Sequence, residues 1–157
     1  VLIGVSFGGI LVQEMSRFLR IRKLIIISSV KSREELPRRM RLAKHTRLYK
    51  LLPTRLVNNI DAFTKYEFGK TVSKRLELYK KYLSVNDKVY LDWAIEQLIC
   101  WRCKKQIPNI IHIHGDKDAV FPIKYISNKI VLEGGTHIMI VNKFKWFNEN
   151  LPKLIIE

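Results

Sequence analysis

A chain of 157 residues with 47% apolar and 10% aromatic residues is long enough for one domain with a hydrophobic core, which excludes a disordered or fibrous protein. It has no apolar run near the ~18 residues that a membrane-spanning helix needs and no secretory signal pattern, so we expect a cytoplasmic protein without a transmembrane segment. The net charge of +15 is compatible with nucleic acid, anionic lipid or an acidic substrate as a partner.

The first 30 residues predict a strand, a tight turn, a helix and a second strand. Val1–Gly4 is typical of the end of a buried strand, and Leu24–Ser28 is apolar throughout most of its length, as in parallel strands covered on both faces. Ile10–Arg20 has helical apolar spacing. One face of this helix carries Leu11, Met15, Phe18 and Leu19. Because the chain opens inside a strand, we expect an N-terminal part to be missing from it.

Residues 31–106 differ from the rest because they are charged and helical and lack strand-like apolar runs. Within them, Lys31–Lys105 holds 19 of the 29 Lys and Arg residues but 8 of the 14 Asp and Glu. Aromatic residues are not interleaved with the basic positions as in nucleic-acid modules, which favours solvated helix faces and no nucleic-acid partner. We interpret the segment as a helical cap inserted between two strands. Three sets of residues have the spacing of one apolar helix face each: Leu36, Met40 and Ala43; Leu76, Tyr79 and Leu83; and Leu91, Ala94, Ile95, Leu98 and Trp101.

The last 50 residues return to alternating strands and helices. Ile110–Ile113 predicts a third buried strand and Ile130–Leu132 a weaker fourth. Between them, Pro122–Asn128 is short enough that we expect only a turn or an extended piece. A final helix carries Phe144, Phe147 and Leu151 on one side. The fold class is therefore α/β, a parallel sheet with a helical cap: residues 1–30 and 107–157 form the core and 31–106 the cap.

The chain has two cysteines, Cys100 and Cys103, in a Cys-x-x-Cys arrangement. Such a pair is either a redox pair or half of a zinc site, but no second pair of ligands accompanies it. We interpret both as reduced structural thiols in the apolar pattern of a helix and expect neither a metal nor a cofactor.

The segment Gly4-Val5-Ser6-Phe7-Gly8-Gly9 fits the Gly-x-Ser-x-Gly pattern between a buried strand and a helix. At such an elbow the serine backbone is strained, and the flanking glycines avoid collisions between strand and helix. We therefore predict Ser6 as a nucleophile. The backbone N–H of Phe7, at the start of the helix, is the predicted oxyanion-hole donor.

A serine nucleophile needs a histidine to take its proton and a carboxylate to hold that histidine. Asp118 follows the third strand and His137 follows the fourth, in the order Ser, Asp, His that hydrolases use. We predict Asp118 as the acid and His137 as the base. Asp116 is the rival acid, and its alternative role is that of a turn aspartate that binds local backbone N–H groups.

These motifs resemble the α/β-hydrolase fold superfamily, in its serine-nucleophile branch, over the C-terminal two-thirds of the domain. Gly115, Asp118 and Pro122 match the spacing of the family's acid loop, and Gly134-Gly135-Thr136-His137 resembles the turn that presents its histidine. The resemblance implies that four strands and a second oxyanion donor lie upstream of Val1. It follows that the chain by itself is expected to be unstable and inactive.

Three further histidines are weaker candidates. His45 lies in the charged segment and is expected to be solvated. His112 and His114 alternate along one strand face, so they are either core histidines with satisfied hydrogen bonds or, for His114, a brace of the acid loop. Two histidines at this spacing can bind a metal, but no third ligand accompanies them.

A serine nucleophile supports acyl transfer, and we favour a carboxylesterase or lysophospholipase-like enzyme acting on a small-molecule acyl ester. Two alternatives stay open: an acyltransferase with the same triad, and a non-catalytic relative that binds a polyanion or a partner protein through its basic helices. Aromatic residues of the cap either line the pocket or pack between helices. They are Phe63, Tyr79, Tyr82, Trp93 and Trp101. The oligomeric state is not predicted.

Overall fold

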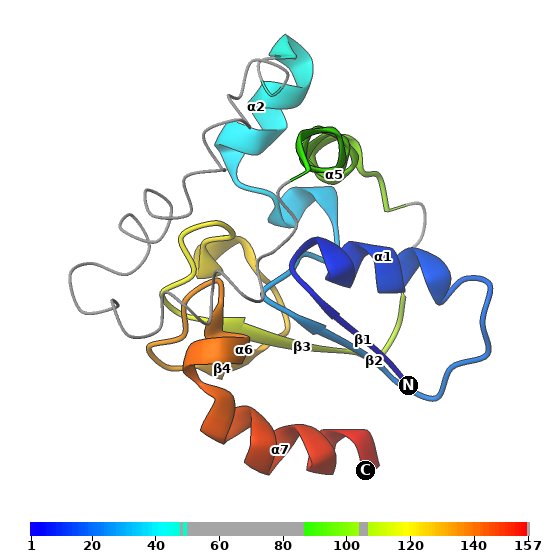
Figure 1. Cartoon of the computed structure of the whole chain (residues 1–157), viewed down its shortest axis with the longest axis vertical. Coiled ribbons are helices and arrows are strands. Elements are labelled where there is room, and N and C mark those ends of the chain that lie inside the picture. The colour runs from blue at the N-terminus through cyan, green and yellow to red at the C-terminus, as the bar shows by residue number, and fades with distance from the viewer. Residues whose placement is uncertain (48, 50–86, 104–106, 157) are drawn as a thin grey trace. The chain divides into compact units, whose positions relative to one another are not determined.

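The structure is a computed structural model that describes residues 1–47, 49, 87–103 and 107–156 (Figure 1). Its internal contacts divide the chain into two units, Val1–Arg41 with Trp101–Glu157, and Leu42–Cys100. Most of the predicted cap falls outside the described residues, so its boundaries stay a prediction. The same holds for the predicted positions Phe63, Leu76, Tyr79, Tyr82 and Leu83.

A parallel sheet of four strands forms the centre of the first unit. The strands are β1 (Leu2–Val5), β2 (Leu24–Ile27), β3 (Ile110–Gly115) and β4 (Ile130–Leu132), and they lie side by side in that order. All four lie where the sequence predicts them. β3 runs two residues further than expected, because His114 and Gly115 pair with β4. The polar turn after β3 therefore begins at Asp116.

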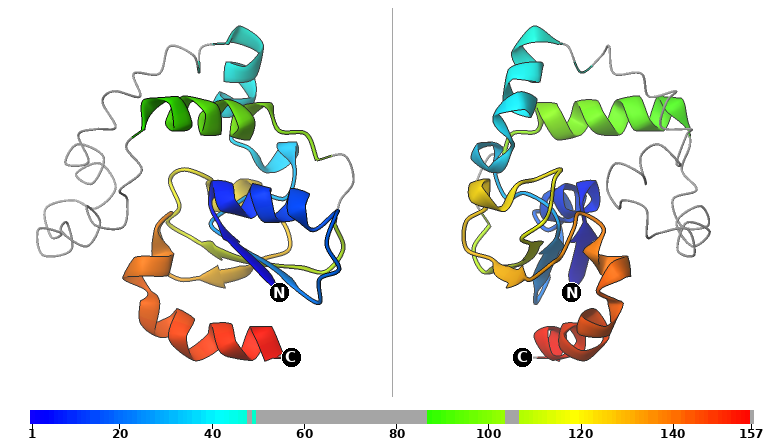
Figure 2. Two further views of the ribbon diagram at one scale, coloured as in Figure 1. Left: turned by 45° about the vertical axis from the view of Figure 1, so that its right-hand side comes forward. Right: turned by 90° about the vertical axis from the view of Figure 1, so that its left-hand side faces the viewer.

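The core lies on both faces of this sheet. On one face, β2, β3 and β4 pack against α6 (Met139–Asn142) and α7 (Phe144–Ile156) through a cluster of buried apolar side chains (Figure 2). The cluster comprises Ile25, Ile27, Ile113, Leu132, Met139 and Phe147. The opposite face is covered by α1 (Phe7–Met15) (Figure 1). Burial of β2 on both faces explains its unbroken apolar sequence.

The predicted apolar face of α1 is exposed, so that part of the interpretation is wrong. The helix ends at Met15, five residues before the predicted end at Arg20, and Phe18 beyond it is 85% exposed. Instead, the helix buries Gly9, Ile10 and Gln13. Gln13 tolerates burial because its Nε2 donates to the carbonyls of Gly9 and Val30, each at 2.9 Å.

The remaining helices are short. A 3₁₀ turn, η1 (Arg33–Glu35), precedes α2 (Arg38–Thr46), and a second one, η5 (Ile123–Tyr125), is the short piece expected between β3 and β4. The second unit contains α5 (Lys88–Cys100). In the described ranges, every helix is too short or too polar to cross a membrane.

Two predictions for the end of α5 need correction. Trp101 and Cys103 lie beyond the last residue of the helix, Cys100, and not on its apolar face. Trp101 is buried in the first unit, where its Nε1 donates to Glu14 Oε1 at 2.9 Å. It is therefore held by α1. Cys100 and Cys103 form no disulfide.

Candidate active site

Ser6 occupies the sharp turn between β1 and α1. Its φ of 53° and ψ of −123° lie in a region that side chains other than glycine rarely adopt. Three hydrogen bonds hold this conformation: Ser6 N donates to Ile27 O at 2.9 Å, and Ser6 O accepts from Gly9 N at 2.9 Å and from Ser29 Oγ at 2.7 Å. Two of these partners follow or end β2, so the neighbouring strand fixes the strained residue.

The glycines around Ser6 have different reasons to be glycine. A Cβ on Gly4 would stand 2.3 Å from the carbonyl oxygen of Gly8, and a Cβ on Gly9 would stand 2.3 Å from Ser29 Oγ. For Gly8, no described atom outside its chain neighbours and the backbone of its own helix lies within 4 Å of a Cβ position. The expectation that glycine avoids a collision is therefore correct for Gly4 but wrong for Gly8 within the described part. It extends instead to Gly9.

The loops after β3 and β4 approach each other through two glycines. A Cβ on Gly115 would stand 2.1 Å from the carbonyl oxygen of Gly135, so the backbones touch at this point. Lys117 N also donates to Gly135 O at 2.9 Å, and Gly134 has a φ of 64°. This contact places the loop that carries Asp118 against the loop that carries His137.

The structure brings Ser6, His137 and Asp118 into one chain of hydrogen bonds. Ser6 Oγ lies 2.8 Å from His137 Nε2, and His137 Nδ1 lies 3.0 Å from Asp118 Oδ2 and 3.2 Å from Oδ1. The Ser6 side chain makes no capping hydrogen bond to α1, although it stands at the N-cap position. A carboxylate only accepts hydrogen bonds, so Nδ1 carries the imidazole proton and Nε2 faces the serine hydroxyl as an acceptor.

The carboxylate of Asp118 is fully buried and well provided with donors. Its Oδ1 accepts from the backbone N–H groups of Val120 and Phe121, both at 2.9 Å. These bonds offset the cost of burying a charged group. The ring of Phe121 meets the ring of His137 edge-on, with 5.3 Å between centroids. The loop therefore contacts both Asp118, the predicted acid, and His137, the predicted base.

Asp116, the rival acid, does not join this chain. Its Oδ1 is buried and has no hydrogen-bond partner among the described residues, and its backbone N–H donates to Leu132 O. Phe7, the predicted oxyanion-hole donor, is the first residue of α1. Its backbone N–H thus belongs to the first turn of the helix, directly after Ser6.

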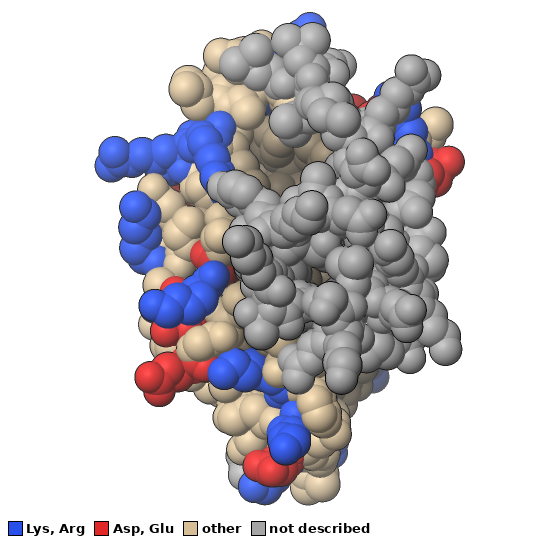
Figure 3. Space-filling model, turned by 60° about the vertical axis from the view of Figure 1, so that its left-hand side comes forward, with Lys and Arg blue, Asp and Glu red and all other residues tan. Residues whose placement is uncertain are grey.

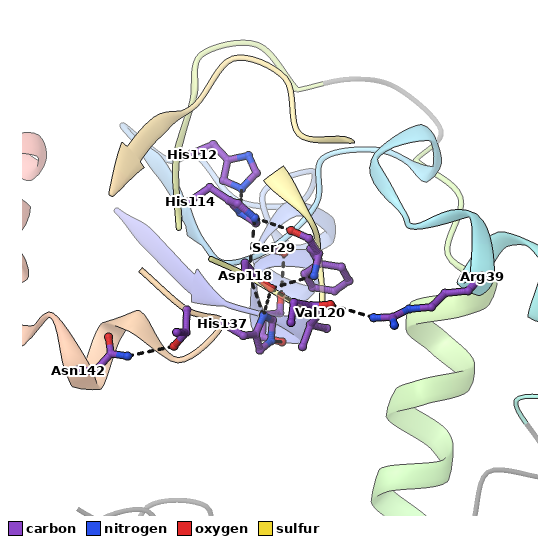
Figure 4. Close-up of polar contacts among 12 residues, drawn as sticks. Ser29, Arg39, His112, His114, Asp118, Val120, His137 and Asn142 are labelled. Atoms are coloured by element: carbon purple, nitrogen blue, oxygen red, sulfur yellow. Dashed lines mark hydrogen bonds and ion pairs between the residues drawn. The ribbon is translucent and has the colours of Figure 1, made fainter. Parts of the chain in front are cut away.

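Two buried histidines lie behind the acid loop. His112 and His114 point from the same face of β3, and His114 Nε2 lies 2.7 Å from the carbonyl oxygen of Phe121 (Figure 4). Burial, together with the proximity of His114, lowers the pKa of His112 from 6.5 to about 3. Burial also lowers the pKa of His114. His45, by contrast, is exposed on α2, as expected.

Sequence reasoning missed two contacts that support the site. Ser29 holds the carbonyl of Ser6, and Arg39 Nη2 donates to Ala119 O in the acid loop at 2.9 Å (Figure 4). Neither residue belongs to a local motif, so no spacing in the sequence indicates them. In the part of the chain that the structure covers, no cluster of three or more His, Cys, Asp or Glu side chains is placed to hold a metal ion.

No protein-family model matches the chain, and no curated protein matches it. Among solved structures it is similar to a meta-cleavage product hydrolase from Pseudomonas fluorescens IP01, an alanine-for-serine mutant in complex with acetates. The sequence identity is 17% and the TM-score 0.50, over 98% of this chain and 63% of that chain. The chain thus spans less than two thirds of this neighbour. The similarity confirms the predicted fold class: the sheet and its helices form part of an α/β-hydrolase fold.

Proposed function

We propose that the protein is a serine hydrolase that cleaves a carboxylic ester. The observation that carries this proposal is the unbroken hydrogen-bond chain from Ser6 Oγ through His137 to the buried Asp118 carboxylate, with links of 2.8 and 3.0 Å. A nucleophile, a base in contact with it and an acid that orients the base are the parts that acyl transfer requires. The strained backbone of Ser6 supports the same role.

In this proposal Ser6 Oγ attacks the ester carbonyl carbon while its proton passes to His137 Nε2. The carbonyl oxygen becomes an oxyanion, which the N–H of Phe7 stabilises at the start of α1. His137 then protonates the leaving alcohol as the carbon–oxygen bond breaks, which leaves an acyl group on Ser6. Water attacks this acyl group and gives a proton to His137. The bond between the acyl carbon and Ser6 Oγ then breaks, the acid is released, and His137 returns the proton to Ser6 Oγ. Asp118 stays ionised throughout and stabilises the protonated imidazole.

A carboxylesterase or lysophospholipase-like activity on a small acyl ester agrees with the serine nucleophile. A basic surface would also suit an acidic ester. On the face shown in Figure 3, however, acidic side chains lie among the basic ones over the described surface. We therefore base the proposal on the triad and not on surface charge.

The test is fluorophosphonate labelling of the full-length protein, read by intact mass, with p-nitrophenyl ester hydrolysis as the activity assay. We expect one adduct, absent from Ser6→Ala. Asp118→Asn should lower turnover by about 10⁴-fold, whereas the matched variant Asp116→Asn should leave it unchanged. Folded protein without an adduct would refute the proposed function, and a loss confined to Asp116→Asn would show that the acid is assigned wrongly.

A further inference from the structure

The backbone of Phe121 joins the triad to the two histidines behind it. Its N–H donates to Asp118 Oδ1 at 2.9 Å, and its side chain packs on the His137 ring. Its carbonyl oxygen lies 2.7 Å from His114 Nε2, and both residues are fully buried. The position of the catalytic acid therefore depends on a peptide segment that His114 holds from the other side.

The hydrogen bonds of His114 determine its tautomer. A carbonyl oxygen can only accept, so Nε2 of His114 must carry a proton and donate it to Phe121 O. In the neutral ring, Nδ1 is then an acceptor. His112 Nε2 lies 3.3 Å from this Nδ1 and is the group that can donate to it. His112 thereby stabilises the tautomer of His114 that holds the acid loop.

His114 must also stay uncharged for this arrangement to work. Its Nε2 is only 3.6 Å from Asp118 Oδ2, so a charged His114 would compete with His137 for the same carboxylate. Burial, which lowers the pKa of His114, opposes that charge. The titratable groups that face the pair are Asp118, His137 and Glu35 around His114, and Lys31 and Lys129 around His112.

We propose that His114 is a positioning residue for the triad: as the neutral Nε2–H tautomer, supported by His112, it fixes the Phe121 segment so that Asp118 faces His137. The inference rests on the proposed function, since it assigns His114 a role in the same reaction. His114 touches neither the substrate nor the nucleophile in this role. Its removal displaces the acid, and misplacing a catalytic group by about 1 Å can cost ~10²-fold in rate.

The test compares His114→Phe, which keeps a ring without a donor, with His114→Gln, whose Nε2 can still donate to Phe121 O. We expect His114→Phe to lower kcat about 10- to 100-fold with little change in KM. The low-field proton resonance of His137 Nδ1–H, which reports its bond to Asp118, should disappear. His114→Gln should restore the resonance and most of the rate.

The controls separate this inference from the proposed function. His45→Phe, which changes an exposed histidine, should alter neither readout. If His114→Phe does not fold, His112→Phe replaces it and should weaken the resonance and the rate in the same direction. An unchanged resonance and rate in the histidine variants would overturn the inference. The two proposals can also fail separately. If the wild type has no esterase activity but shows the His137 resonance, and His114→Phe loses that resonance, the positioning role is supported and the hydrolase is refuted.

Discussion

Acid should destabilise this protein through His112, which is 1% exposed. Burial lowers its pKa in the folded state from 6.5 to about 3, so between these values the unfolded chain binds a proton that the folded protein does not. Unfolding then takes up a proton, and the free energy of unfolding falls as the pH falls. The stabilisation from neutral His112 is complete above pH 6.5 and is lost progressively below it. His114, whose pKa is also lowered by burial, adds to the loss in the same direction.

The size of this loss of stability follows from the lowered pKa of His112. Each pH unit below 6.5 costs about 1.4 kcal/mol for one such histidine, so His112 alone should remove about 2 kcal/mol between pH 8 and pH 5. Urea unfolding of the wild type and of His112→Gln at both pH values isolates the contribution of His112 to the free energy of unfolding. His112→Gln has no imidazole to protonate at this position. Its free energy of unfolding, relative to that of the wild type, should therefore be about 2 kcal/mol higher at pH 5 than at pH 8.

Titrating groups that do not contact His112 contribute equally in both proteins and cancel in this difference; His114, whose Nδ1 lies 3.3 Å from His112 Nε2, is the exception. His112→Phe, which also lacks the imidazole of His112, should show the same change relative to the wild type between pH 8 and pH 5. If the difference between wild type and His112→Gln is the same at pH 8 and pH 5, the reasoning about a neutral buried imidazole is wrong.

Two further predictions concern the contacts that assemble the site. Gly115→Ala places a Cβ 2.1 Å from Gly135 O, so it should separate the two loops, cost about 1–3 kcal/mol of stability in urea unfolding and strongly reduce fluorophosphonate labelling. Labelling at the wild-type rate would contradict the proposed contact. Ser29→Ala removes the 2.7 Å bond to Ser6 O and should lower stability by about 1 kcal/mol and slow labelling. Unchanged labelling kinetics would show that the strained turn holds without Ser29.

The sheet and the order of the site residues could be predicted because both leave local signals. β2 is a short run of apolar residues, the composition that a parallel strand buried on both faces needs, and β3 has three isoleucines among its six residues. Ser6, Asp118 and His137 each follow a strand, and parallel strands place those ends at the same edge of the sheet. The sequence alone thus predicted that the three side chains would lie close together, and in the structure they lie within hydrogen-bond distance of one another in series.

The buried face of α1 could not be predicted, because apolar periodicity assumes that the apolar stripe faces the core. Here the close approach of Gly9 to Ser29 determines which side of the helix meets the sheet, and Gln13 is buried beside it with both amide protons bound. Leu11 and Met15 are left on the opposite side. The close packing of Gly9 against the Ser29 side chain, which apolar periodicity does not register, therefore accounts for the orientation of the helix.

The contacts of Phe121 could not be predicted from the sequence either, for a different reason. Its apolar side chain gives no sign that its backbone N–H and C=O connect Asp118 to His114. The two ends of the site share one kind of contact, in which a side chain from a neighbouring strand or loop binds a backbone carbonyl. Ser29 donates to the carbonyl of Ser6, and His114 donates to that of Phe121. We therefore expect that a chain that keeps Ser6, Asp118 and His137 but loses these two supports would keep the sequence motif and lose the close hydrogen bonds among the three proposed catalytic side chains.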